Sequence, residues 1–107
     1  MANRAYMITM DKGGLLDTFD YTKFHKSLTC AKGVISWWHY LQSTYIIIVS
    51  EKSNAASVGK FIINNAPKKQ FFVAKIDLND HFGLLPKDAW DWINSQITPP
   101  NPKNRLA

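Results

Sequence analysis

Four short segments of this chain have the pattern of β-strands, because they are rich in β-branched and aromatic residues and are bounded by residues that favour turns. They are residues 5–10, 34–40, 44–49 and 70–76. The first alternates apolar and polar positions and is ended by Lys12, Gly13 and Gly14. The link at residues 41–43 is short, so the second and third strands are predicted to form an antiparallel hairpin.

Apolar positions three and four residues apart predict the helices. One helix begins after an N-cap at Asp20 and ends before Gly33, with an inner stripe of Tyr21, Phe24, Leu28 and Ala31. A second begins after Ser53 or Asn54 and ends before Pro67, with an inner stripe of Ala55, Val58, Ile62 and Ala66. Pro86 suits a first helical position and starts a short third helix over residues 87–95, with Trp90 and Ile93 on one side.

The order of these elements predicts an α+β fold of the ferredoxin-like βαββαβ type. Its four-stranded antiparallel sheet carries two helices on one face, and a short C-terminal helix is added. We expect a single domain over residues 1–97. Residues 98–107 contain three prolines and are predicted to be a flexible tail.

Both faces of the predicted sheet are apolar, although two helices cover only one of them. The C-terminal helix, a second copy of the chain or a stacked nucleic acid could cover the other. We favour a homodimer, since isologous pairs are the commonest oligomers. Aromatic residues of the second and third strands and of the last helix are the predicted interface: Trp37, Trp38, Tyr40, Tyr45 and Trp92.

The composition narrows the class of protein. At 107 residues with 46% hydrophobic and 20% charged side chains, the chain has the size of one folded domain. Its longest apolar run, residues 45–49, is too short to cross a bilayer, and its one cysteine cannot form an internal disulfide. With no secretory signal at its start, we expect a cytoplasmic protein with no membrane partner.

The net charge of +5 comes mostly from lysine, with eleven Lys and two Arg. Positive charge favours phosphate partners and also keeps proteins soluble, and both interpretations stay open. Because arginine is the residue that reads guanine edges, sequence-specific recognition of bases is not indicated. The candidate nucleic-acid contacts are Lys12, Lys23, Lys26, Lys68 and Lys69.

Asp11 is the candidate catalytic and metal-ligating residue. It follows the first strand directly and precedes two glycines, a position from which a carboxylate can bind Mg²⁺. Asp17 and Asp20 could contribute ligands, and a dimer could supply a second Asp11. The alternative is that Asp11 only bonds the turn amides behind it and that no cofactor is bound.

Other motifs are missing or weak. His25, His39 and His81 show no zinc-ligand spacing. Cys30, on the predicted inner half of the first helix, is expected to be a small core residue. The aromatic residues do not match the signature of RNA-recognition domains.

Three stretches together resemble known small proteins. They are the first strand ending in Asp11, the run from Trp37 through Gln42 and Ser43 to Tyr45, and the ending from Leu85 and Pro86 to Trp92. They resemble small bacterial proteins of the SinR family, and their layout is similar to CRISPR-associated protein two. The second resemblance implies a dimer that holds DNA, with the metal-dependent aspartate at Asp11.

These observations lead to two expectations of function. The first is a nucleic-acid-binding or defence-associated accessory protein that acts as a homodimer, in which Asp11 would hold Mg²⁺ for phosphodiester hydrolysis and Lys12 would steer the backbone. The alternative is a non-catalytic interaction protein, of the mobile-element or anti-defence type, that binds a protein partner or sequesters a nucleotide ligand. Whether the chain is an enzyme stays open, with the balance toward a non-enzyme.

Overall fold

The computed structural model describes residues 3–11, 17–96 and 105–106. The chain divides into two compact units, residues 1–75 and residues 76–107. The predicted contacts at Lys12, and the glycines beside it, lie outside the described residues. The described helices are too short and too polar to cross a membrane.

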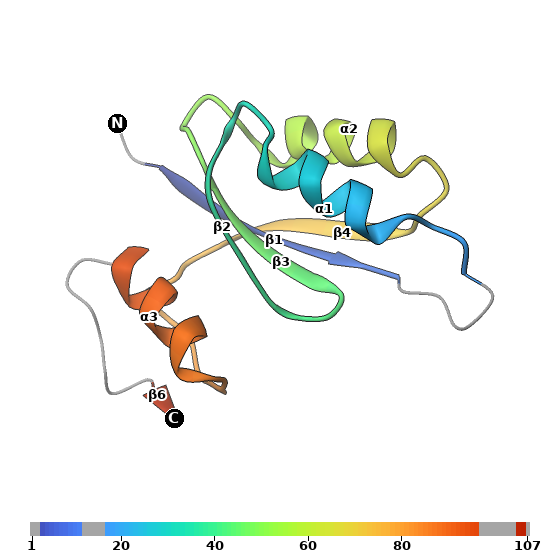
Figure 1. Cartoon of the computed structure of the whole chain (residues 1–107). Helices are drawn as coiled ribbons and strands as arrows, with labels where there is room; N and C mark the ends of the chain where they lie inside the picture. The colour runs from blue at the N-terminus through green and yellow to red at the C-terminus, as the bar shows by residue number, and fades with distance from the viewer. Residues whose placement is uncertain (1–2, 12–16, 97–104, 107) are drawn as a thin grey trace. The chain divides into compact units, whose positions relative to one another are not determined.

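The first unit is built on one four-stranded sheet. Its strands are β1 (Arg4–Met10), β2 (Val34–Leu41), β3 (Thr44–Val49) and β4 (Phe71–Ile76), in the order β2-β3-β1-β4. The central strand β3 pairs antiparallel with β1 on one side and with β2 on the other. The helices α1 (Tyr21–Thr29) and α2 (Ala55–Asn65) lie over the same face of the sheet (Figure 1). This is the ferredoxin-like α+β layout that the order of elements predicted.

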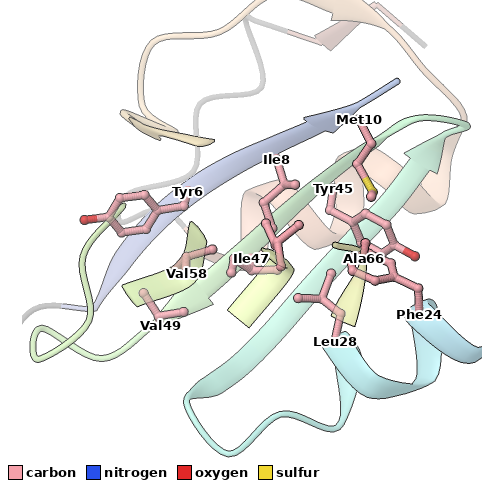
Figure 2. Packing of buried hydrophobic residues seen from close by; sticks show 11 residues of the cluster. Tyr6, Ile8, Met10, Phe24, Leu28, Tyr45, Ile47, Val49, Val58 and Ala66 are labelled. Carbon is pink, nitrogen blue, oxygen red and sulfur yellow. The ribbon is translucent and has the colours of Figure 1, made fainter. Parts of the chain in front are cut away.

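The main core lies between that face and the two helices (Figure 2). Ile8 of β1 and Ile62 of α2 are fully buried, and Leu28 of α1 and Ile47 of β3 are nearly so. Burial of each such side chain contributes roughly 1.5–3 kcal/mol of hydrophobic free energy. Residues on the opposite face are also apolar, namely Met7, Ile46, Ile48 and Phe72. The expectation that both faces of the sheet are apolar is therefore confirmed.

Side-chain caps set the starts of α1 and α2. The Asp20 carboxylate accepts a hydrogen bond from the backbone N–H of Lys23 at 2.9 Å. Asn54 and Ser57 form a reciprocal capping box, with both bonds at 2.9 Å. Each cap satisfies backbone groups that the first turn of a helix leaves without a partner. Both helix starts lie where the sequence predicted them.

Two predicted inward positions are wrong. The helix α1 ends at Thr29, so Cys30 stands at the C-cap and is exposed instead of lying in the core. Ala55 is the first residue of α2 and is also exposed. In both cases the prediction extended the apolar stripe as far as the end of the helix, where the terminal turn no longer packs on the sheet. Ala31, beyond the end of α1, is only half-buried.

The second unit contains β5 (Gly83–Leu84), α3 (Lys87–Gln96) and β6 (Arg105–Leu106). The two short strands pair in parallel, with Gly83 opposite Arg105. Trp90 and Ile93 of α3 are buried, as their spacing predicted, and Trp92 is half-buried. The segment predicted as a tail, residues 98–107, contains β6, and its residues 98–104 and 107 lie outside the described residues.

Candidate functional site

Polar groups gather at the end of the sheet where β1 finishes and α1 begins. Lys69, from the link between α2 and β4, donates hydrogen bonds from Nζ to Asp17 Oδ2 at 2.7 Å and to the Tyr21 hydroxyl at 2.6 Å. The Tyr21 hydroxyl donates in turn to Asp17 Oδ2. A longer bond of 3.3 Å joins Lys69 Nζ to the backbone carbonyl of Asp11. We refer to Asp17, Tyr21 and Lys69 as the ion-pair network.

Lys69 is largely buried within the ion-pair network and bonded to both of its other members. The side chains of Lys69 and Asp17 are only 13% and 14% exposed. Hydrogen bonds to Asp17 and then to Tyr21 raise the pKa of Lys69, so its ammonium stays charged. The ammonium also lies 5.2 Å from the centre of the Phe19 ring, within range of a cation–π contact. Lys69, predicted to be an exposed phosphate contact, is instead engaged within the fold.

A hollow of about 600 Å³ lies beside the network. It is lined by Asp11, Asp17, Thr18, Phe19, Ala66, Pro67, Lys68, Lys69 and Gln70. Lys68 is exposed and, within the described part of the chain, its ammonium makes no ion pair. Among the described residues that line the hollow, Lys68 is thus a cation that is available to a ligand.

The described carboxylates of one chain do not make a Mg²⁺ site at Asp11. Asp11 is exposed, Asp17 is engaged by Lys69 and Tyr21, and Asp20 caps α1. Among the described residues, no group of three or more His, Cys, Asp or Glu side chains is placed to share a metal ion. Since a hard divalent cation takes six or more oxygen ligands, the metal prediction rests on Asp11 and on ligands from outside these residues.

A second cluster consists of aromatic rings from α1, β2 and β3. The Tyr45 hydroxyl lies 2.6 Å from Nδ1 of His25, and the His39 ring stacks on the Tyr45 ring with centres 3.9 Å apart. The rings of His25 and His39 are 5.7 Å apart. Trp37 meets His25 edge to face at 4.9 Å. We refer to His25, His39 and Tyr45 as the histidine cluster.

Burial shifts the pKa values of two groups in this cluster, Tyr45 and His25. It raises the pKa of Tyr45 to about 12, so the hydroxyl keeps its proton. Burial, and then the neighbouring His39, lower the pKa of His25 below its ordinary 6.5. Nδ1 of His39 lies 3.0 Å from the Thr44 carbonyl, and because a carbonyl only accepts, this nitrogen carries a proton. Nε2 of His39 is therefore the nitrogen left to act as an acid or a base.

The histidine cluster opens to a smaller hollow of about 230 Å³. Its lining residues are Met10, Tyr21, Thr22, Phe24, His25, His39, Gln42, Ser43 and Tyr45. Tyr21 belongs to both sites, because its ring lines this hollow and its hydroxyl belongs to the ion-pair network. The two hollows are therefore neighbours across the start of α1.

The other predicted site residues fall into two groups. Lys23 and Lys26 are exposed on α1, and no ion pair engages their ammonium groups among the described residues. Along β2, Trp37 and Tyr40 are 40% and 43% exposed. Trp38 and Tyr45, assigned to the interface from the sequence, are buried at 2% and 5% exposure. Tyr45 is a core residue because β3 is a central strand with α1 packed over it.

Sequence reasoning missed the histidine pair because it looked for histidines close together along the chain. His25 is on a helix and His39 on a strand, with a loop between them. The sequence nevertheless contained a signal that could have identified this pair. His25 lies one turn after Tyr21 on the inner side of α1, and His39 shares with Trp37 the side of β2 that faces α1.

Comparison of the chain with family models, with curated proteins and with solved structures found no match.

Proposed function

We propose that the first unit binds single-stranded nucleic acid along the end of the sheet that carries the two hollows. The observation that supports this most directly is that an available cation, Lys68, lines the larger hollow, while an exposed aromatic ring, Trp37, contacts His25 of the smaller one. Lysines follow a phosphate backbone, and rings stack on unpaired bases of any sequence. Trp37 adjoins this end of the sheet, the proposed binding tract, through its edge-to-face contact with His25.

The charges set how strongly such binding depends on salt. Lys69 is neutralised by Asp17, which leaves Lys23, Lys26 and Lys68 as the candidate phosphate contacts within the described residues. Each contact with a single strand contributes about 0.7 to the logarithmic salt slope, so three contacts correspond to a slope of about −2. A slope near zero would mean that the charge of +5 serves solubility alone.

Fluorescence anisotropy of labelled single-stranded RNA and DNA, from low to physiological salt, tests the proposal. We expect Lys68→Gln to weaken binding and to reduce the slope by about 0.7. We expect Trp37→Ala to weaken binding at every salt concentration with the slope unchanged. Lys52→Gln is the matched control, because Lys52 is exposed beyond the opposite end of β3. Equal losses in Lys68→Gln and Lys52→Gln would contradict the proposed tract.

We also propose that two copies pair through β2. This strand is at the edge of the sheet and exposes Ile35, Trp37, Tyr40 and Leu41. An exposed apolar edge strand invites pairing with another strand, and a second β2 related by a twofold axis would continue the sheet. Pairing of the main chains leaves Trp37 on the helix side of the sheet, where nucleic acid is proposed to bind.

Sedimentation equilibrium tests the dimer. We expect Ile35→Lys to give a monomer, while Phe72→Lys, which changes an exposed apolar residue on the other edge strand β4, leaves the dimer intact. A wild-type monomer at all concentrations, or a dimer sensitive only to Phe72→Lys, would contradict pairing through β2.

Mg²⁺-dependent cleavage at Asp11 and a role in defence remain predictions from the resemblance. If Asp11 acts, its ligand set must include groups outside the described residues, such as Asp11 of a second copy. Loss of Mg²⁺-stimulated cleavage in Asp11→Ala, with binding unchanged, is the expected result. If the protein binds no nucleic acid, the alternative of a protein or nucleotide partner at the exposed rings of β2 takes its place.

A further inference from the structure

Two imidazole rings from different elements of the first unit line one hollow. His25 comes from α1 and His39 from β2, and both line the space of about 230 Å³. That volume corresponds to roughly seven or eight water molecules, at about 30 Å³ each. The hollow therefore has room for a sugar–phosphate linkage next to the two rings.

The hydrogen bonds orient each ring. Nδ1 of His39 is tied to the Thr44 carbonyl at 3.0 Å, and Nδ1 of His25 is tied to the Tyr45 hydroxyl at 2.6 Å. In each ring Nε2 remains for a ligand, and a ring fixed at Nδ1 cannot turn away from it. Tyr45 is a positioning residue here, because it holds one ring by its hydroxyl and the other by stacking.

The two rings also influence each other's charge. They lie 5.7 Å apart, and protonation of His39 disfavours protonation of His25. A pair of titratable groups that holds one proton between them is the arrangement that supplies an acid and a base at the same pH. The titratable groups facing His25 are His39 from β2, Tyr45 from β3 and Tyr21 on its own helix, and none of the described lining residues is a carboxylate.

We propose that His25 and His39 cleave single-stranded RNA without a metal ion, by transfer of the phosphoryl group to the neighbouring 2′-hydroxyl. The inference rests on the proposed binding of nucleic acid and adds a reaction to it. It uses Nε2 of His25 and of His39, which the hydrogen bonds of these rings do not engage, and it is independent of Asp11.

The reaction balances with these two groups alone. Neutral His25 has its ring proton on Nδ1, from which it donates to the Tyr45 hydroxyl oxygen, so its unprotonated Nε2 takes the proton from the 2′-hydroxyl as the O2′–P bond forms. The P–O5′ bond breaks, and O5′ takes a proton from Nε2 of protonated His39. The products are a 2′,3′-cyclic phosphate and a 5′-hydroxyl, and proton exchange with water restores both rings. The side chains of Gln42 and Ser43, which line the same hollow, are available as neutral donors to the non-bridging oxygens.

The test follows cleavage of a labelled single-stranded RNA in the presence of EDTA. The wild-type protein should yield fragments ending in 2′,3′-cyclic phosphate, with a bell-shaped dependence of the rate on pH. His25→Ala and His39→Ala should each lower the rate by about 10²–10⁴-fold. His81→Ala is the matched control, because His81 belongs to the second unit, and it should cleave at the wild-type rate. A strand of the same sequence with 2′-deoxy sugars throughout lacks the attacking hydroxyl, so it should bind but stay intact.

Each failure has a distinct meaning. If RNA binds but is not cleaved in EDTA, the reaction is wrong and the proposed binding stands; if RNA does not bind, both are wrong. Cleavage that needs Mg²⁺ and disappears in Asp11→Ala, or that survives in the double variant of His25 and His39, also overturns the inference. If an alanine variant fails to fold, His25→Gln and His39→Gln replace it, with unfolding curves to verify the fold.

Discussion

The ion-pair network and the histidine cluster lie on the two sides of Tyr21, but they use their polar groups differently. In the network, the ammonium of Lys69 donates hydrogen bonds to Asp17 and Tyr21, so its charge is used within the fold and is not available to a ligand. In the cluster, the stabilising contacts involve Nδ1 and the ring faces, which leaves Nε2 of both histidines. A charged pair therefore stabilises this end of the sheet, while the histidine pair leaves nitrogens for chemistry.

Tyr21 and Tyr45 show the same difference between the two regions. The Tyr21 hydroxyl bonds charged partners at a site that solvent reaches, whereas Tyr45 is 5% exposed and bonds a histidine ring. A hydroxyl beside solvent is replaceable by water, but a buried partner left unsatisfied is costly. We therefore expect the histidine cluster to dominate stability and the network to contribute less.

Removal of the Tyr45 ring should have the largest effect. Tyr45→Ala deletes a buried aromatic side chain between α1 and β3 and leaves a cavity, so the free energy of unfolding should fall by about 3–5 kcal/mol. Tyr21→Ala removes a half-buried ring and should cost clearly less. Urea unfolding of both variants measures the difference, and equal losses would remove the distinction between the two regions.

Removal of the hydroxyls alone should give a smaller effect in the same order. Tyr45→Phe leaves Nδ1 of His25 without its partner, at a cost of about 1–3 kcal/mol. In Tyr21→Phe the direct bond between Lys69 and Asp17 remains, so the loss should be smaller. The measurement is again urea unfolding. A larger loss in Tyr21→Phe would place the main polar contribution in the ion-pair network.

The dependence of stability on pH should separate the two regions at acid pH. Because burial and His39 lower the pKa of His25 below 6.5, the unfolded chain binds a proton more readily as the pH falls. Stability should therefore be complete above pH 6.5 and decline below it, and His25→Gln should flatten this decline. The raised pKa of Lys69 gives a contribution that is present below its ordinary 10.5 and lost above it. Tyr45, whose pKa burial raises from 10.0 to about 12, adds a decline above pH 10 that Tyr45→Phe should remove. Unfolding curves between pH 5 and 11, an interval of about six units around these values, measure these trends.

The ion pair itself should show the smallest effect, visible as coupling between two substitutions. Lys69→Met leaves Asp17 with only part of its partners, and Asp17→Asn does the same to Lys69. The double variant should lose less stability than the sum of the two single variants, since each removes the other's unmatched charge. High salt should reduce this coupling. Strict additivity would mean that the 2.7 Å contact contributes nothing to folding.

Local patterns in the sequence predicted most of the fold. The capping residues Asp20 and Asn54 and the two helical stripes located α1 and α2, and the order of the elements predicted the sheet. The errors at Cys30 and Ala55 came from extending a stripe to the end of a helix, where periodicity no longer reports burial. Tyr45 was predicted to be an interface residue because it is aromatic, but it lies in the core.

The candidate site was much less accessible to sequence reasoning. Lys69 and Asp17 are 52 positions apart, and nothing local distinguishes Lys69 from its exposed neighbour Lys68. His25 and His39 lack any motif spacing, and they meet only because α1 packs over β2 and β3.

The sequence by itself determined the four strands of the main sheet, the starts of α1 and α2, the ferredoxin-like order and the apolar character of both sheet faces, because periodicity and capping act within a few residues. Only the tertiary structure decided which lysine is neutralised and which two histidines share a hollow. Those outcomes depend on distances across the sheet end, where burial changes the charge of a group according to the partners that packing brings to it.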